Sequence, residues 1–214
     1  MRSRSVRRIG AGAALTVTAL VIGAVPAQAT PQGQTSLGSV DVTRTGETVQ
    51  LLPIAQCDVT ADQQNSSQGA RAGGIASYGS GKTVCTRDVN GKTAKMEASG
   101  STFDFTALVP YGGPRIQLSS YTASCEATDK GTTASFRFSG LSGITAPSPI
   151  PANYVATIGP QDAPQAKVTF NEIILANPND GSVTINMMHI VLYPNGGPLS
   201  GDVIVGAAAC SPVS

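Results

Sequence analysis

The 214-residue chain has 14 Lys and Arg against 13 Asp and Glu, and only 13% of its residues are charged. So little charge leaves no basic surface for nucleic acid or anionic lipid, and helical proteins are richer in Glu, Lys and Leu. Abundant Gly, Ser, Thr, Asn and Gln indicate short strands joined by tight turns instead.

The first 29 residues have the pattern of a secretory signal peptide. Four arginines lie among the first eight residues, the stretch from Ile9 to Val25 is uncharged and apolar, and Ala27 and Ala29 supply the small residues of a cleavage site. A retained membrane anchor is the alternative, but about 17 residues is at the short limit for a span. We expect cleavage after Ala29, no membrane association of the product, and one mature domain over residues 30–214.

The mature part, which has a formal charge of −3 from ten basic and thirteen acidic residues, has the apolar alternation of strands. The expected strands are Thr48–Ile54, Thr102–Val109, Arg115–Cys125, Ala134–Phe138, Lys167–Ala176, Ser182–Tyr193 and Asp202–Ala209. Residues 62–81 are polar and Gly-rich, which predicts a long loop or an irregular hairpin.

Two proline-containing segments divide the last part of the chain. Residues 147–151 contain three prolines, which exclude a central strand there. Residues 177–181, Asn-Pro-Asn-Asp-Gly, predict the turn of a hairpin between the strands on either side. No segment has the spacing of a helix longer than two turns, so we predict an antiparallel β-sandwich, Ig-like or jelly-roll-like, with a barrel as the alternative.

All four cysteines lie in the mature part, where an oxidising compartment favours two disulfides. Three pairings are possible. We favour Cys57 with Cys85, which are close in sequence, and Cys125 with Cys210, which would attach the last strand to the sheet. The chain has no C-x-x-C motif and a single histidine, His189, so we expect neither a metal nor a cofactor.

Motifs with a chemical meaning are few. Residues 79–83, Gly-Ser-Gly-Lys-Thr, match only the end of a phosphate-binding loop and lack its first glycine, so we interpret them as a loop. A G-x-S-x-G nucleophile motif is absent from the sequence. Asn65 begins an N-glycosylation sequon, whose use would depend on the host.

One polar cluster lies in the predicted hairpin. With the turn near Asn179, Asn171 and Glu172 would face Met187 and Asn186, and His189 would lie within one or two residue pairs. A carboxylate beside an imidazole can perform acid–base chemistry. The simpler interpretation is that these side chains satisfy one another, and we assign no catalytic residue beyond the candidates Glu172 and His189.

The same hairpin is the centre of a family resemblance. The segments 167–172, 183–190 and 201–206, together with 123–127 and 131–133 upstream, resemble the choice-of-anchor P family of actinobacterial exported proteins over residues 119–210. The resemblance implies a secreted or surface protein whose variable tail sets its attachment, with no activity common to the family. Because the sequence given ends at Cys210-Ser-Pro-Val-Ser without a sorting motif, release or passive wall association is implied.

Two functions follow from these observations. The first is a non-enzymatic extracellular or cell-wall-associated module that binds a cell-wall glycan or another extracellular protein. The absence of Trp argues against a strong sugar-stacking surface. The second is a secreted hydrolase using Glu172 and His189, which requires both side chains to meet in a concave pocket with a third polar group.

Overall fold

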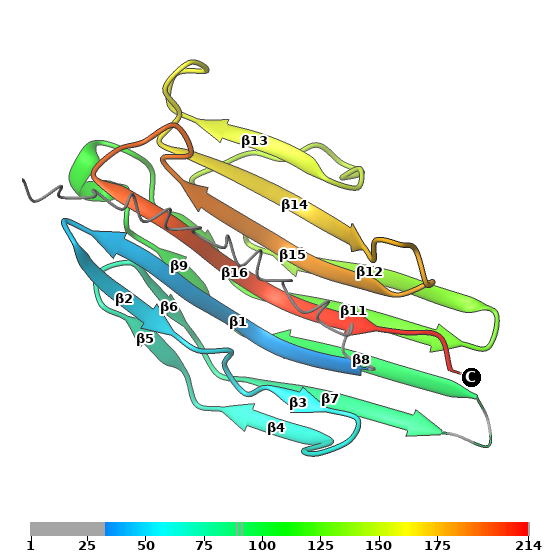
Figure 1. The fold of residues 1–214 in the computed structure, drawn as a ribbon. Helices are drawn as coiled ribbons and strands as arrows, with labels where there is room; N and C mark the ends of the chain where they lie inside the picture. Colours follow the sequence, from blue (N-terminus) through cyan, green and yellow to red (C-terminus); the bar gives the residue numbers. More distant parts are fainter. Residues whose placement is uncertain (1–32, 89, 91, 214) are drawn as a thin grey trace, which may run out of the picture.

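The structure is a computed structural model that describes residues 33–88, 90 and 92–213. The proposed signal peptide, residues 1–29, lies outside the described residues. The described part is an antiparallel β-sandwich, as predicted, with one broad sheet packed against a second layer (Figure 1). Among the described residues the only helical segment is a 3₁₀ turn, η1 (Val109–Tyr111).

The first layer is sheet A, whose strand order is β13-β14-β15-β16-β1-β2, with the short β3 also paired to β1. Every neighbouring pair is antiparallel, and the long β1 and β16 lie side by side near the middle. The strands are β13 (Tyr154–Ile158), β14 (Ala166–Leu175), β15 (Val183–Leu192), β16 (Leu199–Cys210), β1 (Gly33–Arg44), β2 (Glu47–Leu51) and β3 (Cys57–Asp58).

The second layer consists of sheet B, in the order β12-β11-β8-β7-β4, and sheet C, in the order β10-β9-β6-β5. Sheet B contains β12 (Gly131–Ser139), β11 (Ser120–Thr128), β8 (Thr93–Gly100), β7 (Gly81–Asp88) and β4 (Gln64–Ser67). Sheet C contains β10 (Ile116–Leu118), β9 (Phe103–Phe105), β6 (Ala76–Tyr78) and β5 (Ala70–Ala72).

Sheets B and C are successive parts of one layer. Each strand of sheet C is separated by only a few residues from the strand of sheet B that continues it, as β6 continues into β7 and β8 into β9. Backbone hydrogen bonds cross the break, from the Gly79 N–H to the Thr102 carbonyl (2.6 Å) and from the Ser101 N–H to the Ser80 carbonyl (2.8 Å). Sheets B and C therefore form one continuous layer.

Sheet A is interrupted by a line of unpaired positions, which we call the unpaired row: Leu37, Gly206, Met187 and Asn171. Pairing continues on either side of the row in the same register, but the alternation of side chains reverses across it. In β15, Val183, Ile185 and Met187 are buried, and the buried positions then continue from Met188. Gly206 (φ 63°) and Asn171 (φ 51°) leave the extended conformation to allow this reversal.

Two tyrosines from the second layer support the unpaired row from inside the sandwich. The Tyr121 hydroxyl donates to the Leu37 carbonyl oxygen at 3.0 Å. The Tyr78 hydroxyl lies 2.7 Å from the Ile204 carbonyl oxygen and 3.1 Å from that of Ser39. Both rings are buried, and each hydroxyl is satisfied by a backbone acceptor, which lies in the unpaired row for Tyr121 and two residues from it for Tyr78.

The two disulfides are Cys57–Cys85 and Cys125–Cys210, which is the pairing favoured from the sequence. Each joins sheet A to sheet B, because Cys57 and Cys210 belong to sheet A strands and Cys85 and Cys125 to sheet B strands. They lie in one apolar cluster at the same end of the sandwich, separate from the larger aromatic core. The two layers are therefore cross-linked covalently at that end.

The predicted strands are only part of the sheet. The hairpin of β14 and β15 and the final strand are confirmed. The predicted strand Thr102–Val109 is wrong beyond Phe105, where a turn and η1 follow β9. Strands β1, β7, β8 and β13 were not predicted; glycines and polar residues weaken the alternation of the first three. Residues 62–81, predicted as a loop or irregular hairpin, contain the short strands β4, β5 and β6. The proline-rich residues 147–151 form no strand, as predicted.

Candidate functional site

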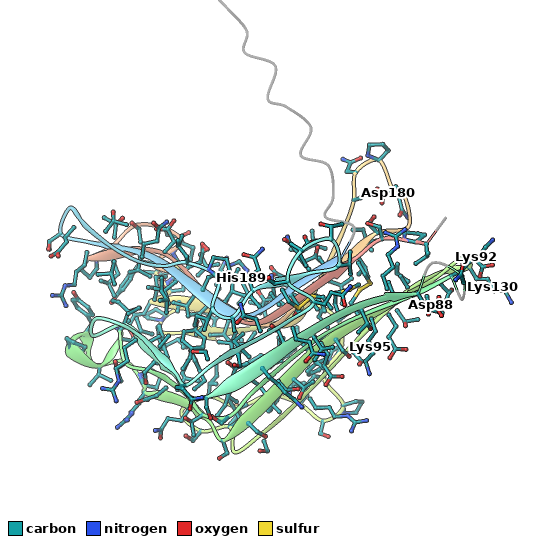
Figure 2. The ribbon with its side chains drawn as sticks, turned by 90° about the horizontal axis from the view of Figure 1, so that it is seen from below. Asp88, Lys92, Lys95, Lys130, Asp180 and His189 are labelled. Carbon is teal, nitrogen blue, oxygen red and sulfur yellow. A yellow bond between two sulfur atoms is a disulfide. The ribbon has the colours of Figure 1, made fainter. Side chains whose placement is uncertain are left out.

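Four polar side chains meet on the outer face of sheet A, and we call them the carboxylate–histidine cluster: Glu172 on β14, Asn186 and His189 on β15, and Asp202 on β16. In Figure 2, His189 lies at the middle of the sandwich, where sheet A dips, and far from the hairpin tips with Lys92 and Lys130. The sequence predicted the first three members of this group.

The unpaired row explains why these side chains share a face. Asn186 and His189 are three residues apart, so in a regular strand they would point to opposite faces. Because Met187 and Met188 are both buried in the core, Asn186 and His189 both point outward. Glu172 is directly opposite Asn186 in the β14–β15 register, so the same reversal brings its carboxylate next to the imidazole.

The cluster is closely connected. His189 Nδ1 lies 3.0 Å from both Glu172 carboxylate oxygens, and Asn186 Nδ2 donates to Glu172 Oε2 at 2.6 Å. On the other side of the ring, His189 Nε2 lies 3.6 Å from Asp202 Oδ1. About one fifth of each of the Glu172 and His189 side chains is exposed, against 42% of Asp202.

These contacts favour an imidazolium between two carboxylates. The hydrogen bond to Glu172 raises the pKa of His189 above its ordinary value, against the effect of burial, and Asp202 adds to the rise. Burial alone would raise the pKa of Glu172, but the hydrogen bonds from His189 and Asn186 outweigh it, and that pKa is lowered. The cluster is therefore a charge-paired connection between the three strands β14, β15 and β16.

This geometry limits the chemistry of the imidazole. A general base needs a neutral ring with one nitrogen directed at the proton it removes. Here Nδ1 is hydrogen-bonded to Glu172, whereas the buried Nε2 makes no hydrogen bond and lies 3.6 Å from Asp202 Oδ1; both carboxylates favour the protonated ring. Glu172 and His189 converge with a third polar group, as the hydrolase hypothesis required, but the raised pKa of the ring favours the charged form over the neutral form that a general base needs.

A shallow hollow of about 210 Å³ lies beside the cluster on the same face. Ile204, which is paired with His189, and Ala207, which is paired with Asn186, line it. The segment after β2 forms one wall, fixed by hydrogen bonds between Ile54 and the backbone of Leu37 and Gly38. The other lining residues are Gln34, Thr35, Ser36, Ser39, Pro53, Gln56, Thr184 and Ala209.

The other predicted site residues have structural roles. Asn171 is not in the cluster; it occupies the unpaired row, and its carbonyl accepts the Asn153 N–H at 2.9 Å. Residues 79–83 run from the break between β6 and β7 into β7, as a connection and not a phosphate loop. Asn65 lies on β4, and its Nδ2 donates to the Gln56 carbonyl.

Sequence reasoning missed Asp202 as a member of the cluster. The residue begins a predicted strand, but sequence alone does not say that this strand lies next to the one with His189. The register pairs Asp202 with Val191, two residues beyond His189 on the same face. Only strand order, with β16 inserted between β15 and β1, could have indicated this contact.

Over the described ranges, no group of three or more His, Cys, Asp and Glu side chains has the arrangement of a metal site. Helices long and apolar enough to cross a membrane are likewise absent from residues 33–213 as described. No protein-family model, curated protein or solved structure matches the chain.

Proposed function

We propose that the chain is an exported, non-enzymatic module that binds an extracellular ligand, either at the cell envelope or after release. The observation that carries the proposal is the position of the only histidine, held between Glu172 and Asp202 with both ring nitrogens facing carboxylates. The raised pKa of the ring favours its charged form, which pairs with both carboxylates and has no free site for a proton.

Three further observations support export. All four cysteines form disulfides between the two layers, which is typical of proteins in oxidising compartments. The first 29 residues have the pattern of a cleaved leader. The resemblance to the choice-of-anchor P family, which we put forward as a proposal, points to the same location.

The hollow on sheet A is the surface we assign to binding. Its lining combines small apolar residues with amide and hydroxyl groups, which is the usual composition of ligand sites. No charged residue lines it, so its own contacts suit a neutral group. The strands beneath it are fixed by the tyrosine hydrogen bonds, so the surface is formed before a ligand arrives.

The test is expression of the full chain in a secreting actinobacterial host. We expect the protein in the medium or the wall fraction, with an intact mass that lacks residues 1–29 and four thiol hydrogens. The recovered protein should sediment with purified envelope, and His189→Gln should retain this binding. An uncleaved, reduced product inside the cells would contradict export. Hydrolysis of envelope material that His189→Gln abolishes would contradict the non-enzymatic assignment.

A further inference from the structure

Two aspartates lie next to the hollow, and their like charges face each other across neighbouring strands. Asp41 on β1 and Asp202 on β16 are directly opposite each other in the antiparallel register. Like charges at such positions destabilise a sheet. His189 lies near Asp202, whereas Asp41 forms no ion pair with any residue in the described ranges 33–88, 90 and 92–213.

The position of this pair relative to the hollow is regular. Ser39 and Ile204 line the hollow and are paired with each other, and Asp41 and Asp202 are the next outward-facing pair along the same strands. Two residues of extended chain span about 7 Å, so the carboxylates lie about that far from the hollow. An uncharged recess and an acidic pair thus lie one strand repeat apart.

The size of the hollow limits what can fill it. Its volume of about 210 Å³ is below the range of pockets that enclose whole drug-sized ligands, roughly 300 to 1,000 Å³. Ile204, Ala207, Ala209 and Pro53 provide apolar surface, and Gln34 and Gln56 provide amides joined by a 3.0 Å hydrogen bond. These dimensions and contacts fit one apolar side chain with a peptide backbone along the amides.

The charges nearby set the second requirement. Asp41, Asp202 and Glu172 place three carboxylates on this face, against the His189 imidazolium and Lys167 two strands away from Asp202. The face therefore favours a positive group over the aspartate pair. In an extended peptide, side chains at i and i+2 point to the same side about 7 Å apart, which is the spacing between the hollow and the aspartates.

We propose that this face binds an extended peptide segment of an extracellular partner, with an apolar side chain at position i in the hollow and a lysine at i+2 between Asp41 and Asp202. The inference rests on the proposed function and specifies its ligand. It requires both elements at once, the recess and the acidic pair, in that order along the peptide.

The experiment is a titration of the full oxidised chain, ¹⁵N-labelled, with short capped peptides followed by amide chemical shifts. The probe Gly-Leu-Ser-Lys-Gly should shift the amides of Ser39, Asp41 and Ile204. Peptides with Gln in place of Lys, or with Lys moved to the position after Leu, should bind about two- to fivefold more weakly, the effect of one exposed ion pair. Raised salt should weaken binding of the first probe.

Variants separate the two contacts. Asp41→Asn should weaken binding of the lysine peptide and leave the glutamine peptide unchanged, whereas Ala207→Leu should fill the hollow and weaken both. Asp129→Asn, with the same charge change in the turn between β11 and β12, is the matched control and should have no effect. Because Asp41 is exposed and its charge opposes that of Asp202, its variant should unfold at a midpoint no lower than that of the original chain.

Three results would overturn the inference. The lysine and glutamine peptides could bind equally well, or the chemical-shift changes could be confined to another face. A neutral oligosaccharide could also displace the peptide and shift the same amides. Envelope binding that survives both Asp41→Asn and Ala207→Leu would also overturn it, and would leave the proposed function standing. Failure of the unchanged protein to bind envelope would contradict the proposed function itself.

Discussion

The Tyr121 hydroxyl donates a 3.0 Å hydrogen bond to the Leu37 carbonyl oxygen from the opposite layer of the sandwich. Leu37 belongs to the unpaired row, where the ladder between β1 and β16 is interrupted. The tyrosine therefore replaces a backbone donor that the sheet does not supply. This contact connects the second layer to the unpaired row, across which the side chains of the carboxylate–histidine cluster come to share one face.

The first prediction concerns this hydrogen bond. Tyr121→Phe keeps the buried ring but leaves the Leu37 carbonyl without its donor, so the free energy of unfolding should fall by about 1 to 3 kcal/mol. Urea unfolding followed by circular dichroism measures it. Tyr154→Phe, on edge strand β13, is the control and should change the stability by less than about 0.5 kcal/mol. Equal effects of the two variants would contradict the role of Tyr121.

The second prediction concerns the glycine of the unpaired row. Gly206 has φ 63°, and a Cβ there would lie 3.2 Å from the Tyr121 ring and 3.4 Å from Met187. Gly206→Ala should therefore combine backbone strain of about 1 to 2 kcal/mol with crowding of the core. Gly112 has a similar φ of 75° with open space around it, so Gly112→Ala should show the strain alone. The difference between the two variants in thermal unfolding measures the effect of crowding alone. A smaller loss of stability for Gly206→Ala than for Gly112→Ala would contradict the close packing of Gly206 against Tyr121 and Met187.

The third prediction is the pH dependence of stability. The raised pKa of His189 gives stability that is fully present below its ordinary value of 6.5 and is lost as pH rises through the folded pKa. The lowered pKa of Glu172 gives stability that is fully present above its ordinary value of 4.5 and is lost as pH falls through the folded pKa. The Glu172–His189 pair should therefore contribute most to the free energy of unfolding between pH 4.5 and pH 6.5. Urea midpoints across pH 3 to 9 measure this, and His189→Gln should remove the decline on the alkaline side.

The fourth prediction concerns the disulfides across the layers. They close 28 and 85 residues of chain separation, and chain-entropy reasoning assigns them about 3.5 and about 4.5 kcal/mol. Replacing Cys125 and Cys210 together by Ser should therefore cost more stability than replacing Cys57 and Cys85. Guanidinium unfolding of the two double variants, each with its remaining disulfide intact, tests the order. The reverse order would show that local packing outweighs loop closure.

Much of the fold could be predicted because its signals are local. The proline and glycine turn between β14 and β15 set their pairing, and with it the opposition of Glu172 and Asn186. The disulfide pairing followed from sequence distance and from the position of the last strand. By contrast, β1 was missed, because Gly33, Ser36, Gly38 and Ser39 make a poor apolar pattern despite their place in the centre of sheet A.

The geometry of the candidate site could not be predicted, because it depends on the reversal at the unpaired row. Strict alternation places Asn186 and His189 on opposite faces, and adjacent buried methionines are not a recognisable signal in an apolar strand. The positive φ of Asn171 and Gly206 is needed to bring the two residues together, and it becomes visible only with the strands in register. Asp202 joins them through strand order, which is a property of the whole sheet.

The most direct test of this account is the protonation state of His189 in the folded, oxidised chain. Because His189 is the only histidine, one imidazole signal appears in a two-dimensional ¹H–¹⁵N spectrum. We predict a ring protonated on both nitrogens at pH 6, with a pKa above 6.5 that falls in Glu172→Gln. A neutral ring at pH 6 with a pKa below 6.5 would contradict the charge-paired cluster, and with it the main argument against a catalytic base.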